Sequence, residues 1–296
     1  MTRPEALIKS FETAIHLSKG TRIQRLLKSP TKLAYSKFLE LISVWFRQSF
    51  SLKANTFWDE QMLVVIPERV SLSIYRYGFF EEDLTRMLLE YLEPGMTFID
   101  VGAHFGYFTV LGAFIVGNKG QIHSFEPTQS SFDILRANVS NRNNVILNRN
   151  AVSSEQKTVS INDYGIRYSA FNSMYEARLP RYIKSNLTHK RFEITAIPID
   201  EYVEIKNIKP SFVKVDAERC EYEILVSMQE TIDKFRPIVS IEVGDEDLQT
   251  YPSSKSSIDF LMDRNYTPYE FNDGKIMKHT VRNEQYRSAN ILFMPS

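Results

Sequence analysis

This sequence has a single cysteine, no excess of charge of either sign and no long apolar run. One cysteine excludes an intrachain disulfide and fits a reducing compartment. Lys and Arg balance Asp and Glu at 36 each, so no global field favours nucleic acid or an anionic membrane. The most apolar stretch, residues 33–46, contains Ser, Lys and Glu and is shorter than the about 20 apolar residues that a spanning helix needs. The sequence therefore predicts a soluble cytoplasmic protein.

The charges themselves are unevenly distributed along the chain. Residues 1–55 hold ten Lys and Arg but three acids, a net charge of +7, and the remainder carries −7. Half of these basic residues lie close together, namely Lys19, Arg22, Arg25, Lys28 and Lys32. They either form a solvated helix face or attract an anionic partner, such as a carrier protein, a phosphorylated substrate or a membrane surface.

Hydrophobic spacing separates an N-terminal extension, residues 1–56, from a catalytic domain over residues 57–296. Apolar residues recur at helical spacing in the extension, and Pro30 predicts a break between two helices. We expect the extension to contribute to the acceptor pocket or to a contact between copies of the chain. Residues 62–66 and 70–75 are short β-rich runs that predict a hairpin.

From residue 81 onward, strand-like and helix-like segments alternate. Predicted strands cover residues 97–101, 121–126, 145–149, 212–216 and 238–243, and predicted helices cover residues 81–92, 106–116 and 128–138. Such alternation predicts an α/β fold whose mostly parallel sheet has helices on both faces.

The first chemical motif lies where the strand over residues 97–101 ends. Asp100 closes the strand, Gly102 permits a tight turn and close approach of a ligand, and Gly106 opens a helix that must pack tightly against the strand. The helix N-terminus offers N–H groups to a carboxylate, and Asp100 can accept from an ammonium group. His104, in the same loop, is a weaker candidate for a base and is expected to make loop hydrogen bonds.

The second motif is Glu126, at the end of the next strand. A carboxylate there can accept from both hydroxyls of a ribose. Asn150, after the third strand, either contacts an adenine or forms a turn. A dinucleotide site needs G-x-G-x-x-G to admit a pyrophosphate, whereas here Asp100 takes the first position and would repel phosphate. The loop therefore favours S-adenosylmethionine, which carries a cationic amino acid end.

These motifs, together with Phe212 to Glu218 further on, resemble the FkbM-type methyltransferase family over residues 78–296. The resemblance implies a Rossmann-like class I methyltransferase fold, with a seven-stranded sheet that includes one antiparallel strand. It also implies S-adenosylmethionine as cofactor and O-methylation of a hydroxyl on a sugar or natural product. The family pattern K-x-D-x-E-G has Arg219 in place of its glycine here.

Four charged residues are candidates for catalysis: Lys214, Asp216, Glu218 and Glu242. We expect Asp216 to lie near the methyl group and Glu218 or Glu242 to remove the proton from the acceptor. Lys214 and Glu242 could equally form a charge pair between neighbouring strands. No cluster has metal-ligand spacing, so the sequence predicts no metal.

Two alternatives to a methyltransferase remain. A cofactor-binding interaction protein that has lost turnover is suggested by Arg219 alone, and a dinucleotide-dependent oxidoreductase is disfavoured by Asp100. A nucleic-acid partner is not expected, because the chain is neutral and lacks an N/D-P-P-[FY] motif.

Overall fold

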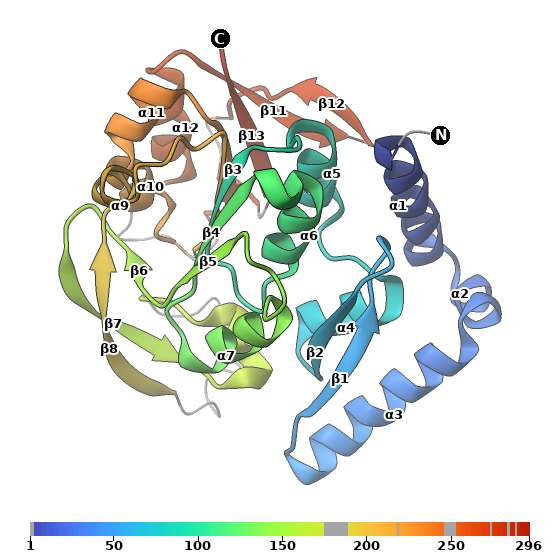
Figure 1. Cartoon of the computed structure of the whole chain (residues 1–296). Helices are drawn as coiled ribbons and strands as arrows, with labels where there is room; N and C mark the ends of the chain where they lie inside the picture. Colours follow the sequence, from blue (N-terminus) through green and yellow to red (C-terminus); the bar gives the residue numbers. More distant parts are fainter. Residues whose placement is uncertain are drawn as a thin grey trace.

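A computed structural model of the chain describes residues 3–174, 189–217, 219–245, 253–272, 274–282, 285–287 and 289–296. Its main feature is a sheet of eight strands in the order β12-β11-β13-β10-β9-β3-β4-β5 (Figure 1). The strands are β3 (Thr97–Val101), β4 (Gln121–Phe125), β5 (Val145–Asn148), β9 (Phe212–Val215), β10 (Ile238–Val243), β11 (Tyr266–Asn272), β12 (Lys275–Lys278) and β13 (Ala289–Pro295).

The strand directions agree with the predicted α/β class and correct one detail of it. Strands β5, β4, β3, β9 and β10 are parallel, whereas β13 runs antiparallel to β10 and β11, and β12 antiparallel to β11. The sheet thus has one strand more than the seven expected, because β12 extends the edge beyond β11. Two strands, not one, run against the others.

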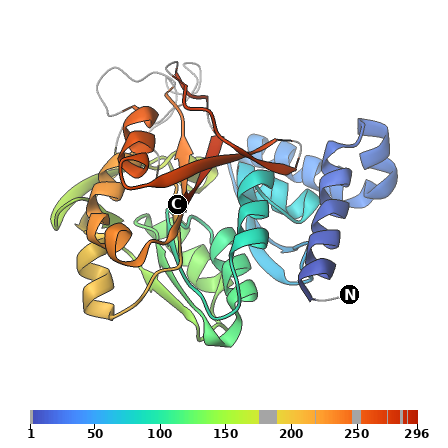
Figure 2. The ribbon, with the colours of Figure 1, turned by 90° about the horizontal axis from the view of Figure 1, so that it is seen from above.

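Helices cover both faces of this sheet, as Figures 1 and 2 show. Successive residues of a strand point to opposite faces, so Phe98 packs in the core under one helical layer and Ile99 in the core under the other. One layer contains α5 (Glu82–Tyr91), α6 (Tyr107–Val116) and α7 (Gln129–Asn138). The other contains α9 (Ile199–Lys206), α10 (Glu221–Ser227), α11 (Gln229–Phe235) and α12 (Ser254–Met262).

A smaller sheet follows β5 in the chain. It contains β6 (Ala151–Val152), β7 (Lys157–Asp163) and β8 (Lys190–Ile197), in the order β6-β8-β7. The 3₁₀ helix η2 (Ile166–Phe171) comes after β7 and brings Ser169 to the loop that follows β3. This region forms one side of the site described below.

The predicted hairpin over residues 62–75 is wrong in its second half. Strand β2 (Gln61–Ile66) pairs instead with β1 (Phe50–Asn55), and residues 69–77 form the helix α4 (Arg69–Tyr77). Local capping explains the helix: the Glu68 carboxylate accepts from the N–H groups of Val70 and Ser71 at 2.8 and 2.7 Å. Such capping satisfies backbone donors that a helix start leaves open.

The N-terminal extension contains α1 (Arg3–Lys19), α2 (Arg22–Lys28) and α3 (Pro30–Phe46). The predicted break at Pro30 is confirmed, since α2 ends and α3 begins there. Helix α1 packs on the domain through Phe11, whose ring lies 4.9 Å from that of Phe57 and 5.3 Å from that of Phe79. Strand β1 pairs with β2, so a hairpin joins the extension to the domain across residue 56.

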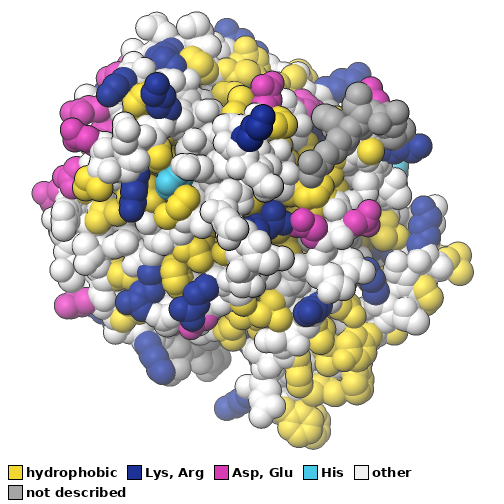
Figure 3. Space-filling view, viewed as in Figure 1, with side chains coloured by type: hydrophobic (Ala, Val, Ile, Leu, Met, Phe, Trp, Pro, Cys, Tyr) yellow, Lys and Arg dark blue, Asp and Glu magenta, His cyan; other side chains and the backbone are white. Residues whose placement is uncertain are grey.

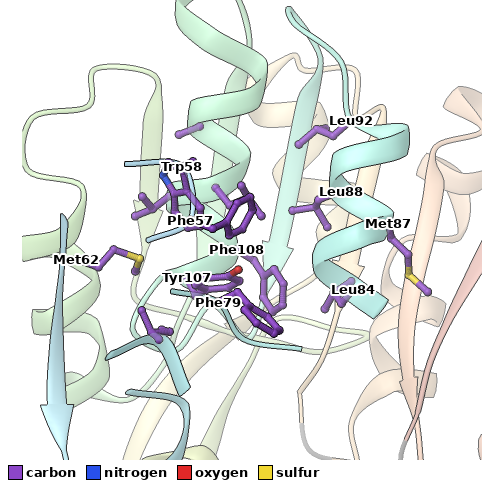
Figure 4. Packing of buried hydrophobic residues seen from close by; sticks show 14 of the residues in the cluster. Phe57, Trp58, Met62, Phe79, Leu84, Met87, Leu88, Leu92, Tyr107 and Phe108 are labelled. Atoms are coloured by element: carbon purple, nitrogen blue, oxygen red, sulfur yellow. The ribbon is translucent and has the colours of Figure 1, made fainter. Parts of the chain in front are cut away.

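The core that anchors the extension is aromatic where it meets α6. In Figure 4, Phe57 and Trp58 lie against Tyr107, with Phe79 and Phe108 nearby. The ring centroids of Trp58 and Tyr107 are 5.5 Å apart. Edge-to-face aromatic packing of this kind stabilises both neighbours by about 1 kcal/mol beyond area burial. It fixes the start of α6, which borders the site. Within the described part of the chain, no helix is long and apolar enough to span a bilayer.

Candidate active site

A cavity of about 310 Å³ lies at the carboxyl ends of β3, β4 and β9. This volume falls within the range of small-molecule sites, and the carboxyl edge is where ligands bind in open α/β sheets. Four carboxylates line it: Glu81, Glu126, Asp216 and Glu242. Of the other predicted site residues, Gly102, His104, Asn150 and Lys214 also line it. The two predicted groups, for cofactor and for catalysis, therefore meet in one cavity.

Asp100 lies behind this cavity and does not line it. It is fully buried, with one oxygen 3.0 Å from Lys214 Nζ and the other accepting from the Thr109 hydroxyl at 2.7 Å. Strand register places Asp100 beside Lys214 on adjacent strands. Both oxygens are thus engaged within the protein, and Asp100 holds β3 to β9 where the cofactor loop begins.

Lys214 is the cation at the centre of the site. Its ammonium also donates to the Gly102 carbonyl at 3.0 Å and lies 3.3 Å from an Asp216 oxygen. Burial opposes its charge, but Asp100 and Asp216 outweigh that effect and raise the pKa of Lys214. A lysine held protonated in this way cannot remove a proton. The sequence suggested Glu242 as a partner for Lys214, whereas the structure gives Lys214 ion pairs with Asp100 and Asp216.

Backbone conformation favours glycine at both loop positions, and packing against backbone also requires it at Gly102. Gly102 has φ +77°, and a Cβ there would lie 1.8 Å from the Asp216 carbonyl oxygen. Gly106 has φ +87°, and its Cβ would lie 2.4 Å from the Leu135 side chain in α7. The close neighbour of Gly106 is therefore a helix and not the strand that the sequence suggested. The two glycines let the loop pass between β9 and α7.

Glu126 binds the loop to the end of β4. Its carboxylate accepts from the His104 N–H at 2.9 Å and from the Thr128 N–H at 2.9 Å. An ionised carboxylate has about four acceptor positions, so two remain for a ligand. Burial raises the pKa of Glu126 to about 7, against the two backbone hydrogen bonds, which lower it.

His104 belongs to the same loop and is held on both sides. It has φ +51°, its ring stacks on Phe105 at 3.9 Å, and its Nε2 lies 2.8 Å from the Ser169 hydroxyl. Burial lowers the pKa of His104 to about 3. The ring is therefore neutral at physiological pH and links the cofactor loop to η2.

Asn150 lines the cavity from the segment after β5, where its side chain donates to the Thr195 carbonyl at 3.2 Å. Glu218 lies outside the described residues. Its neighbour Arg219 has φ +78°, a conformation that favours glycine. The glycine of the family pattern therefore matches the backbone at this position, and Arg219 adopts the same turn under strain.

Glu81 and Arg69 are charged residues of the cavity lining that the sequence did not reveal. Glu81 precedes α5, has φ +41° and accepts from Asn290 Nδ2 at 3.2 Å. Burial is the main cause that raises the pKa of Glu81 to about 7, followed by repulsion from Asp216. No motif surrounds it in the sequence. Only the fold brings the start of α5 beside the end of β9.

A sequence model described as "Methyltransferase FkbM domain" matches residues 100–268, more than half of the chain. The chain belongs to the FkbM methyltransferase family. The match begins at Asp100 and includes the predicted site residues, whereas Glu81 and its partner Asn290 lie outside it. It leaves α1, α2 and α3 outside the family domain.

Several solved structures are similar to this FkbM-family chain, whereas none of the curated proteins matches it. Methyltransferase FkbM from Methylobacillus flagellatus KT is 13% identical, with a TM-score of 0.43, over 75% of this chain and 52% of that one. This chain thus spans about half the length of that protein. Aeropyrum pernix fibrillarin with natively bound S-adenosyl-L-methionine is 14% identical, with a TM-score of 0.43, over 71% and 73% of the two chains.

Proposed function

We propose that this protein transfers a methyl group from S-adenosylmethionine to a hydroxyl on a sugar or natural-product small molecule. Membership of the FkbM methyltransferase family supports the reaction class. The observation that supports a hydroxyl acceptor is the carboxylate pair Glu81 and Asp216, which lines the cavity beside the buried Lys214. A hydroxyl must lose a proton as it is methylated, and these side chains supply an acceptor for it.

The chemistry of the lining fits the proposed cofactor. S-adenosylmethionine carries a sulfonium and an ammonium cation, and the cavity has four carboxylates. Two cations, Arg69 and Lys214, also line it, and Lys214 is already paired with two carboxylates of the protein. A dinucleotide would instead place a pyrophosphate against a lining in which carboxylates outnumber cations by four to two, which electrostatic repulsion disfavours.

Each residue has a role in the proposal. Glu126 would accept from the ribose hydroxyls through its two remaining acceptor positions, and Asn150 would lie next to the adenine. The N–H groups that precede Val110 in the first turn of α6 would donate to the cofactor carboxylate, since the first hydrogen bond within the helix is the one from Val110 N–H to the Gly106 carbonyl. Asp100 acts indirectly, because it positions Lys214 and the loop that follows β3.

When bound, S-adenosylmethionine supplies a methyl group on a positively charged sulfur, open to attack by an oxygen. Glu81 accepts the acceptor proton at its carboxylate, which a pKa of about 7 suits to neutral pH. Asp216 hydrogen-bonds the acceptor and keeps Lys214 in place. Glu242, which also lines the cavity, is the second candidate for the base. Alignment of the oxygen with the methyl group supplies much of the remaining rate.

A transfer assay with methyl-labelled S-adenosylmethionine tests this proposal. The purified chain is incubated with sugars and natural products that carry hydroxyl, amino or carboxyl groups. We expect label in products that withstand mild alkali, as methyl ethers do and methyl esters do not. Transfer confined to amino or carboxyl groups would contradict O-methylation of a hydroxyl and leave the methyltransferase class intact.

A further inference from the structure

The α2–α3 segment, Arg22–Phe46, exposes more large apolar side chains than any other part of the described chain. Nine of the thirteen exposed large hydrophobic residues lie in it. Trp45, Leu27 and Ile23 are exposed to 83%, 77% and 72%. Figure 3 shows hydrophobic side chains gathered over the region that α3 occupies in Figure 1. Single exposed apolar residues are ordinary, whereas a concentration of this kind marks an interaction surface.

Helix α3 packs on the protein through a mixed face that contains two serines and one leucine, Ser36, Leu39 and Ser43. Ser36 and Ser43 are buried, and Ser36 accepts from Arg76 Nε at 2.9 Å. The same guanidinium donates to Glu40 at 2.8 Å. Helices normally bury the apolar face and expose the polar one. In α3, by contrast, most of the large apolar side chains are exposed, so they are available for contact with something other than this chain.

That outward face is continuous and aromatic. Tyr35, Phe38 and Trp45 are exposed, and their spacing of three and seven residues places them on one side of the helix, with Leu41 beside them. In α2, Ile23, Leu26 and Leu27 are exposed at helical spacing as well. Helices that lie in a membrane interface have aromatic and aliphatic residues on one face, and α2 and α3 have this feature.

Basic residues accompany this apolar face. Residues 22–47 contain six Lys and Arg and a single acid, Glu40, a net charge of +5. Lys28, Lys37 and Arg47 are exposed. Long basic side chains beside an apolar face reach the headgroups of anionic lipids while the face enters the acyl boundary. A second copy of the chain would instead bring two such positive segments together, which like-charge repulsion opposes.

We propose that the α2–α3 segment docks this protein on the surface of an anionic lipid bilayer, with Phe38, Leu41 and Trp45 inserted at the level of the headgroups. This surface lies outside the residues that match the methyltransferase family, and none of its residues lines the cavity. Docking would place the enzyme next to acceptors that are carried by lipids or are themselves amphipathic.

Sedimentation of the full chain with lipid vesicles tests the proposal. We expect binding to vesicles of phosphatidylcholine with phosphatidylserine, little binding to phosphatidylcholine alone, and weakening with added salt. Leu41→Ser with Trp45→Ser should reduce binding at least about tenfold. Lys28→Gln with Arg47→Asn should reduce it by about tenfold or more. Ile205→Ser with Met277→Ser, at exposed apolar positions elsewhere, should leave it unchanged.

Tryptophan fluorescence locates the contact. The chain has two tryptophans, and Trp45 is exposed whereas Trp58 is 4% exposed. Anionic vesicles should shift the emission to shorter wavelength, and Trp45→Phe should abolish the shift while retaining binding. Equal binding to neutral vesicles, no binding, or equal losses in the control variant would overturn the proposal. So would a dimer that Trp45→Ser dissociates without any vesicle binding. None of these readouts depends on methyl transfer.

Discussion

At the carboxyl ends of β3 and β9 this protein buries charge, whereas along α3 it exposes apolar side chains. Lys214 is 1% exposed and Asp100 is fully buried, yet Trp45 is 83% exposed. Each region departs from the usual partition of side chains between core and surface. The buried charges are satisfied by one another, within the chain. The exposed apolar face of α3 is proposed to contact a lipid surface outside the chain. The buried charges therefore indicate a site, and the face of α3 indicates an interaction surface.

The largest effect is expected where buried charge loses its partner. Lys214→Met should destabilise the fold by about 3–5 kcal/mol, because it leaves the Asp100 carboxylate buried without its cation. Denaturant unfolding measures this change. The control is Lys255→Met, which removes an exposed partner of Asp259 and should alter stability by less than about 1 kcal/mol. Similar losses in the two variants would show that burial does not distinguish these pairs.

Catalysis should depend on Glu81 more than on its exposed neighbours. Glu81→Gln should lower kcat by about 10²–10⁴-fold while leaving cofactor affinity nearly unchanged, because it removes a proton acceptor. Since the base must be ionised, kcat/KM of the unmodified enzyme should rise with pH through about 7. Asp83→Asn, at an exposed position of the same helix, should keep both the rate and the pH profile. If kcat/KM of Glu81→Gln still rose with pH through about 7, the base would be another group, and Glu242 would be tested next.

Glu126 should make stability depend on pH. Its pKa rises from an ordinary 4.5 to about 7 on folding, so the folded protein binds this proton more tightly than the unfolded chain. The associated stability is present below pH 4.5 and is lost as pH rises toward 7, by up to about 3 kcal/mol. Glu126→Gln should flatten this part of the unfolding free energy profile. If the free energy of unfolding changed equally with pH in the two proteins between pH 4.5 and 7, the raised pKa of Glu126 would be contradicted.

Arg219 is a position at which a substitution is expected to stabilise the folded protein. Arg219→Gly should stabilise the protein by about 1 kcal/mol, since φ +78° is unstrained only for glycine. Thermal unfolding measures this as a rise in Tm. A fall in Tm would mean that contacts of the Arg219 side chain outweigh the backbone strain.

The smallest effect is expected on α3. Trp45→Ser should change the unfolding free energy by less than about 0.5 kcal/mol, because the side chain is largely exposed in the folded state as well. Chemical denaturation in the absence of lipid checks this. A loss of several kcal/mol would show that Trp45 packs within the chain and would remove the basis for the comparison with the buried cluster.

The sequence predicts the regular part of the fold well. Alternation of apolar runs placed β3 and β10 at the residues observed, because strands buried on both faces leave strong local signals. The predicted strand over residues 70–75 is wrong, and these residues are most of α4, since the capping by Glu68 is visible only in three dimensions. The strand β12 was missed for a similar reason. It is short, lies at the edge and is mostly exposed, so it has little apolar pattern.

The site was predictable where chemistry follows from chain order. Glu126 and Gly102 lie at strand ends, which parallel topology brings to one edge. The partner of Asp100 could not be chosen from the sequence, because strand register decides that Lys214 lies beside it. The place of Glu81 in the site could not be predicted from the sequence, since this residue lies outside the motifs. The predicted roles of these residues in binding and catalysis stay predictions until ligands and substrates are measured.

Calorimetric titration of the purified protein with S-adenosylhomocysteine and NADH tests the central claim most directly, with Glu126→Ala measured in parallel. We predict micromolar binding of S-adenosylhomocysteine, weakened about tenfold or more by Glu126→Ala through loss of the ribose contacts, and no comparable binding of NADH. Preference for NADH, or no binding of either ligand by a folded protein, would contradict the account.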